Sequence, residues 1–179
     1  MNFFRNFLFC GLLMVAGRAY GQNLWHDELA RALPLMGHRN WIVVAEPAFP
    51  LVNATGIDVV TTDMSQTDLL TAVLDTLSRA RHVRPAFYTD AELPYVAETD
   101  ALGIGSYRAQ LAMLLKGGQV TVLPHDQLMT DLVDVSRGYR VLVLKSTTLL
   151  PYSSVFIELD SGYWSADAEK RVRSAMQGK

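Results

Sequence analysis

The chain has 179 residues, half of them hydrophobic, and a formal net charge of −2 at pH 7. This length and hydrophobic content fit one domain with a sizeable core. A net charge this small gives no electrostatic case for binding nucleic acid.

The first 21 residues have the pattern of a secretory signal peptide. Arg5 supplies an early positive charge, an apolar run covers residues 7–16, and the small residues Ala19 and Gly21 suit a cleavage site after Gly21. The apolar run is shorter than the roughly 20 residues that a membrane-spanning helix needs. The sequence therefore predicts an exported protein, periplasmic or secreted, that leaves the membrane once the signal is cleaved, with an uncleaved N-terminal anchor as the alternative.

Cleavage would also change the chemistry available to the mature chain. It removes the only cysteine, Cys10, and two arginines, which changes the net charge from −2 to −4. A chain without cysteine has no disulfide, no zinc–thiolate site and no cysteine nucleophile. Export without disulfides is compatible with a bacterial periplasm.

Strand and helix patterns alternate along most of the remaining chain. Apolar runs typical of strands lie at residues 41–46, 57–62, 84–90, 119–124, 139–145 and 154–159. Helical patterns lie at residues 26–38, 65–80, 105–118 and 125–137. This alternation predicts an α/β fold whose mostly parallel six-stranded sheet is covered by helices on both faces. No helix separates the last two strands, so these are expected to pair differently.

Helix-end signals and a change in composition set the expected boundaries. Asp27 is a plausible N-cap of the first helix and Gly37 its stop, while Ser65 with Asp68 resembles a capping box. A DSG turn then leads into a charged tail. We therefore expect one domain over residues 22–164 and a charged tail over residues 165–179.

Common catalytic motifs are absent from the sequence, which has no GxGxxG, P-loop, GxSxG or HExxH pattern. Their absence disfavours nucleotide-binding and serine-hydrolase functions. No residue spacing indicates a metal site or a cofactor.

Two histidines and an acid stand at the ends of predicted elements. Glu46 ends a buried strand, and ligands of α/β sheets bind at the carboxyl ends of strands. His125 follows Pro124 at a helix start, where the helix dipole disfavours the charged imidazolium and so favours a neutral base. His38 follows a helix stop. Each of the three could instead be an ordinary solvated side chain.

Tyr152 lies in a hydroxyl-rich loop, residues 146–154, that also carries Ser154. A tyrosine in such a loop is often a packing residue with a solvated hydroxyl. Taken with the histidines and Glu46, however, it gives two imidazoles, a carboxylate and a phenol. This set suits sugar binding and proton transfer to and from hydroxyls.

Four segments, in order, resemble the RbsD/FucU-like family of D-ribose pyranases and L-fucose mutarotases. They are DELARALPLMGHRNWIVVAEPAFP, SQTDLLTAVLDTL, PHDQLMTDL and PYSSVFIELDSGY. The first matches a family pattern of a helix ending in Gly-His, an apolar strand and an acid, and the last matches a Pro-Tyr loop before a strand. The similarity spans about residues 24–162.

The resemblance implies a three-layer α/β/α fold without cofactor or metal. It implies a homo-oligomeric ring, often a decamer, with sites between neighbouring subunits. It also implies a mutarotase or pyranase, an isomerase that interconverts anomers or ring forms of a monosaccharide by opening the hemiacetal. His38 would be the general acid/base and Glu46 its partner, and His125, Tyr152 and Ser154 would bind the sugar or relay protons.

The chain departs from the family pattern at two of these positions. Glu46 stands where the family has Asp, and Ser154 where it has Asn. The signal peptide is a further departure, because family members are expected to be cytoplasmic. The loss of the Asn favours the alternative function, a non-catalytic protein that binds or senses a monosaccharide on the same fold, whereas retention of both histidines and the tyrosine favours catalysis.

Overall fold

Six strands form a single sheet in the order β2-β5-β1-β6-β3-β4. The computed structural model describes residues 24–178, so the predicted signal peptide lies outside the described residues. The strands are β1 (Trp41–Ala45), β2 (Ile57–Thr61), β3 (Val83–Asp90), β4 (Val120–Leu123), β5 (Val141–Lys145) and β6 (Val155–Ser161). Five of them run parallel, and β6 is antiparallel to both of its neighbours. The predicted α/β class, the mostly parallel sheet and the different pairing of the last strand are confirmed.

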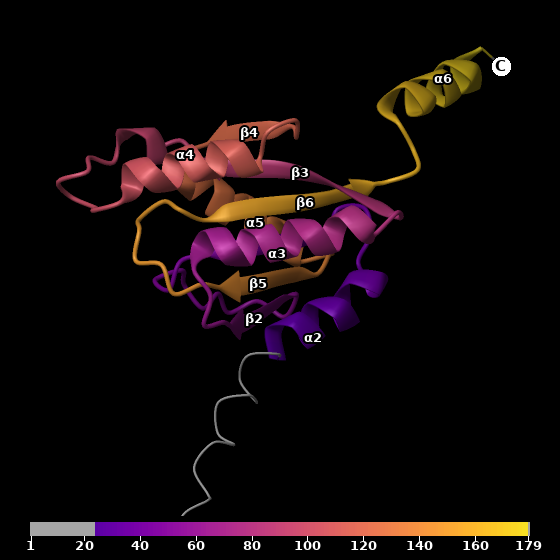
Figure 1. The fold of residues 1–179 in the computed structure, drawn as a ribbon. Coiled ribbons are helices and arrows are strands. Elements are labelled where there is room, and N and C mark those ends of the chain that lie inside the picture. The colour runs from indigo at the N-terminus through magenta and orange to yellow at the C-terminus, as the bar shows by residue number, and fades with distance from the viewer. Residues whose placement is uncertain (1–23, 179) are drawn as a thin grey trace, which may run out of the picture.

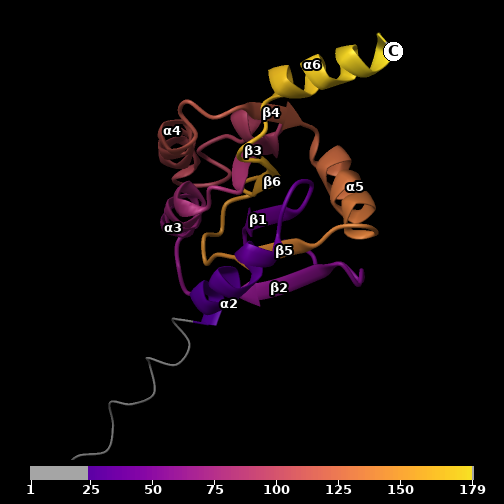
Figure 2. The same cartoon turned by 90° about the vertical axis from the view of Figure 1, so that its right-hand side faces the viewer.

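Helices cover both faces of this sheet, as expected for a three-layer α/β/α fold (Figures 1 and 2). Helices α2, α3 and α4 lie on one face, and α5 lies on the other. Their bounds are α2 (Leu24–Ala32), α3 (Gln66–Arg79), α4 (Ile104–Leu114) and α5 (His125–Ser136). Each face of the sheet has its own apolar core beneath these helices.

The central strand β1 shows how the sequence produces the layers. All five of its residues are buried. Ile42 and Val44 belong to the core under α3 and α4, whereas Trp41, Val43 and Ala45 belong to the core under α5. Successive side chains of a strand point to opposite faces, so a strand covered on both sides needs a continuous apolar run.

The helix ends agree with the sequence signals at α3 and differ at α2. At α3, the Ser65 hydroxyl accepts a hydrogen bond from the Asp68 N–H at 3.2 Å, as the capping pattern predicts. In contrast, α2 includes Leu24 and has Asp27 in its first turn, so Asp27 is not the N-cap. A 3₁₀ turn, η1 (Leu33–Leu35), follows α2 because its proline lacks a donor for another α-helical turn.

The charged tail contains a twelve-residue helix, α6 (Ala166–Gln177), which Ser165 caps by accepting a hydrogen bond from the Ala168 N–H at 3.1 Å. None of its residues is buried, and it projects away from the sheet (Figure 1). Within residues 24–178, no helix has the length and apolar character needed to span a membrane.

The backbone just before β2 lies close to the backbone of Ser136 and Tyr139, and this close contact requires a glycine. A Cβ at Gly56 would lie 2.1 Å from the backbone oxygen of Ser136 and 2.9 Å from that of Tyr139. We expect Gly56→Ala to lower the free energy of unfolding by about 2–3 kcal/mol, because backbone must move to relieve the overlap. Gly138→Ala is the control, since a Cβ there meets nothing within 4 Å. Equal urea midpoints for the two variants would contradict this packing.

Candidate functional site

The carboxyl ends of the parallel strands form one edge of the sheet, here called the carboxyl edge, and polar side chains gather along it. Glu46 follows β1, Asp90 ends β3 and His125 follows β4. The antiparallel β6 begins at the same edge, directly after Ser154, with Tyr152 in the loop before it. Four of the five side chains predicted for the site therefore lie at the edge where open α/β sheets bind ligands.

Glu46 and Ser154 contact each other at the centre of this edge. The Ser154 hydroxyl donates a short hydrogen bond to Glu46 Oε2. Ser154 is only 1% exposed, whereas Glu46 is partly exposed. The β1–β6 register pairs Val44 with Val155, so the residues that leave β1 lie beside those that enter β6. The two positions at which the chain departs from the family pattern are thus direct neighbours.

His125 is hydrogen-bonded to a buried acid that sequence reasoning missed. Its Nδ1 lies 2.9 Å from Asp90 Oδ1, and the Asp90 side chain has no exposed surface. Both carboxylate oxygens of Glu92 accept a hydrogen bond from the His125 backbone N–H at 3.1 Å, which adds a negative charge at the start of α5. The β3–β4 register, which pairs Asp90 with Leu123, sets this geometry.

The environment of Asp90 is unfavourable for a carboxylate. Burial raises the pKa of Asp90, His125 lowers it in part, and the carboxylates of Glu92 and Glu46 raise it further. Asp90 Oδ2 is buried and has no hydrogen-bond partner among the described residues. An unsatisfied buried polar atom destabilises a fold, so the position of this acid calls for an explanation beyond packing.

Tyr152 lies against the ring of His125. The two ring centroids are 5.7 Å apart with the rings nearly perpendicular, at 81°. Tyr152 has a φ of 56°, in the left-handed region that is uncommon for a bulky residue. Strained backbone of this kind occurs most often at functional sites.

Two buried side chains hold the loop that carries Tyr152 and Ser154. Gln66 Nε2 donates hydrogen bonds to the backbone oxygens of Val44 and Ser153, both at 2.8 Å. The Tyr107 hydroxyl donates to the same Ser153 oxygen, and burial raises the pKa of Tyr107. These contacts connect α3 and α4 to the entry of β6 and so fix the position of Ser154.

Replacing Gln66 tests this support. We expect Gln66→Leu to lower the free energy of unfolding by about 2–3 kcal/mol, because two buried carbonyls lose a donor. Gln110→Leu provides the matched control, since the Gln110 side chain donates to Ser106 on the exposed face of α4. Chemical denaturation compares the two. A Gln66 variant as stable as the Gln110 variant would show that these hydrogen bonds do not support the loop.

His38 lies at the opposite edge of the sheet. It precedes β1, its Nδ1 is 2.9 Å from Asp160 Oδ1, and its side chain is 57% exposed. Arg84 also binds Asp160 and helps to lower the pKa of that carboxyl against the effect of its partial burial. At roughly 3.3 Å per residue, β1 keeps His38 more than about 15 Å from Glu46. The two predicted acid–base partners therefore do not meet within one chain.

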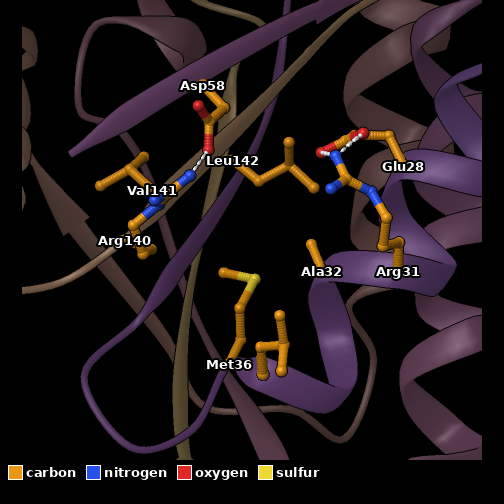
Figure 3. A pocket seen from close by; sticks show the side chains of 9 residues that line it. Glu28, Arg31, Ala32, Met36, Asp58, Arg140, Val141 and Leu142 are labelled. Atoms are coloured by element: carbon orange, nitrogen blue, oxygen red, sulfur yellow. Dashed lines mark hydrogen bonds and ion pairs between the residues drawn. The ribbon is translucent and has the colours of Figure 1, made fainter. Parts of the chain in front are cut away.

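A separate cavity of about 400 Å³ opens between α2 and strands β2 and β5 (Figure 3). Met36 and Leu142 are among its apolar walls, and the ion pairs Glu28–Arg31 and Asp58–Arg140 lie at its sides. None of the predicted site residues lines it. The charged groups at its sides are paired with each other.

The carboxyl edge provides groups for proton transfer and for binding hydroxyls. It combines one imidazole with carboxylates, a phenol and a hydroxyl. Across residues 24–178 no cluster of three or more His, Cys, Asp and Glu side chains is arranged to hold a metal ion.

The arrangement of strands and helices is that of the RbsD-like α/β proteins. The chain is similar to RbsD from Bacillus subtilis, solved in complex with D-ribose, with a TM-score of 0.52, 15% sequence identity and coverage of 78% of this chain and 94% of that chain. It is also similar to FucU from Bifidobacterium longum, with a TM-score of 0.53, 17% identity and coverage of 75% and 94%. No family model and no curated protein matches the chain significantly. At these identities the likeness shows a shared fold.

Proposed function

We propose that this protein is a monosaccharide isomerase, a mutarotase or pyranase that interconverts anomers or ring forms of a sugar. The observation that carries the proposal is the grouping of the His125–Asp90 pair with Glu46, Ser154 and Tyr152 at the carboxyl edge. The fold supports it, because RbsD from Bacillus subtilis has this fold and was solved with D-ribose.

The reaction requires two proton transfers and no cofactor. A base accepts the proton of the anomeric hydroxyl while an acid protonates the ring oxygen, so that the bond between C1 and the ring oxygen breaks and C1 becomes a carbonyl carbon. Rotation about the C1–C2 bond, or attack by a different hydroxyl, followed by reclosure gives the other anomer or ring size. General acid–base catalysis of this kind contributes about 10²- to 10⁴-fold in rate.

Because the candidate residues lie at two edges of the sheet, we propose that two subunits share each site. Glu46, His125, Tyr152 and Ser154 of one chain would bind the sugar, and His38 of a neighbouring chain would complete the acid–base pair. A contact of one edge with the opposite edge of the next copy is heterologous, and such contacts form a ring when the rotation between copies closes. This agrees with the homo-oligomeric ring that the sequence resemblance implies.

A non-catalytic sugar-binding or sensing protein is the second candidate. The separation of His38 from Glu46 favours it, because a single chain has only one of the two predicted acid–base groups at its carboxyl edge.

Magnetisation-exchange NMR distinguishes the two functions. D-ribose, L-fucose and related sugars are observed with and without the protein, and exchange between anomer or ring-form signals is measured. The isomerase accelerates exchange for at least one sugar. Broadening of the sugar signals without faster exchange would support the binding protein and contradict the isomerase.

Export through the N-terminal signal is also part of the proposal. We expect the intact mass of the protein isolated from its host to begin at Gln22, because the small residues Ala19 and Gly21 suit signal peptidase. A chain that retains residues 1–21 in the cytoplasmic fraction would contradict export.

A further inference from the structure

We infer that Asp90 is a positioning residue that makes His125 the proton acceptor of the site, by keeping hydrogen on Nδ1 and leaving Nε2 unprotonated toward the sugar. The inference rests on the proposed function for the identity of the substrate, and it changes the expected role of His125 from binding to proton transfer.

Three contacts position His125, two of them at the imidazole ring and one at the backbone. Asp90 bonds Nδ1 at 2.9 Å, Glu92 bonds the backbone N–H at 3.1 Å, and the Tyr152 ring lies edge-on at 5.7 Å. Among residues 24–178, Nε2 has no hydrogen-bond partner, and the His125 side chain is 28% exposed. Nε2 is therefore the one polar atom of the ring that remains available to a ligand.

The charge of Asp90 determines the tautomer. An ionised carboxylate only accepts hydrogen bonds, so the contact between Oδ1 and Nδ1 requires hydrogen on Nδ1. The neutral ring then carries its lone pair on Nε2. When Nε2 takes the proton of the anomeric hydroxyl, the imidazolium that forms is stabilised by the Asp90 carboxylate, and Asp90 itself takes up no proton. The proton returns to a sugar oxygen on reclosure.

Burial indicates that this pair serves function more than stability. The Asp90 side chain has no exposed surface and its Oδ2 has no partner among the described residues, although Glu46 and Glu92 add negative charge nearby. A buried carboxylate with an unpaired oxygen destabilises the fold, so packing alone does not explain an acid at this position. Removing the charge should therefore leave stability unchanged or raise it while activity falls.

The test compares wild type with Asp90→Asn, using the full chain. In ¹⁵N NMR of the histidine side chains, assigned with His125→Gln, wild-type His125 should show hydrogen on Nδ1 and an unprotonated Nε2. Asp90→Asn should shift hydrogen toward Nε2 and lower kcat for sugar exchange about 10²-fold, with KM within about threefold. Its melting temperature should equal or exceed that of wild type. Asp134→Asn, on the exposed side of α5, should change none of these quantities.

Two results would overturn the inference. One is a wild-type His125 that carries hydrogen on Nε2, and the other is an Asp90→Asn variant with wild-type kcat. The tautomer is measured without substrate, so this measurement tests the role of Asp90 even if no sugar is isomerised. Absence of exchange in wild type would contradict the proposed function alone.

Discussion

His38→Ala and His125→Ala should each lack sugar exchange, and an equal mixture of the two, assembled together, should recover about a quarter of wild-type activity. The reason is the geometry of the sheet, which places the two histidines at opposite edges of one chain. A site built from two chains is intact when one chain supplies an unaltered His38 and its neighbour supplies an unaltered carboxyl edge. Exchange rates of co-refolded mixtures measure this recovery.

The control mixture combines His125→Ala with Tyr152→Phe. These side chains pack together within one chain, so every site in the mixture has a damaged carboxyl edge and activity should stay low. Recovery in this control, or full activity in His38→Ala alone, would show that the site is not shared between subunits in the proposed way.

The second large effect concerns the contact between Glu46 and Ser154. The sequence resemblance implies Asp and Asn at these positions, and the structure brings the two departures into one hydrogen bond. The acid is thus longer than the one that the resemblance implies, and its hydrogen-bond partner is shorter. We expect Glu46→Asp to lose this bond and lower activity at least about tenfold, since misplacement of a reacting group by about 1 Å is costly.

The paired substitution should reverse the loss. Ser154→Asn alone adds volume to a residue that is 1% exposed and should also lower activity about tenfold. The double variant Glu46→Asp/Ser154→Asn restores the combined length and should return to within about threefold of wild type, because residues in contact show non-additive effects. Losses that simply multiply in the double variant would contradict the coupling.

Four of the five candidate side chains lie at one edge of the sheet because one rule applies to every parallel strand. Glu46 and His125 both follow apolar runs, so their shared edge was predictable. The same rule applies to Asp90, which ends the third predicted strand, but its burial and its contact with His125 depend on pairing between β3 and β4 that the sequence does not show. The positive φ of Tyr152 likewise depends on the folded loop.

His38 shows that proximity in sequence does not imply proximity within one folded chain. It is eight positions from Glu46, yet an extended strand separates positions by roughly 3.3 Å per residue, so residues that flank a strand lie at opposite edges. A helical segment of the same length would have kept them about 12 Å apart. The family resemblance implies sites between neighbouring subunits, and this is how we propose that His38 and Glu46 meet.

Two-dimensional exchange NMR of a sugar labelled with ¹³C at C1 tests the central claim most directly. The anomers give separate signals, and their cross-peak intensity reports the rate at which the hemiacetal opens and closes. With D-ribose or L-fucose, wild-type protein should raise this rate in proportion to its concentration, and His125→Ala should not. Rates equal to those in buffer for every sugar tested would contradict the account.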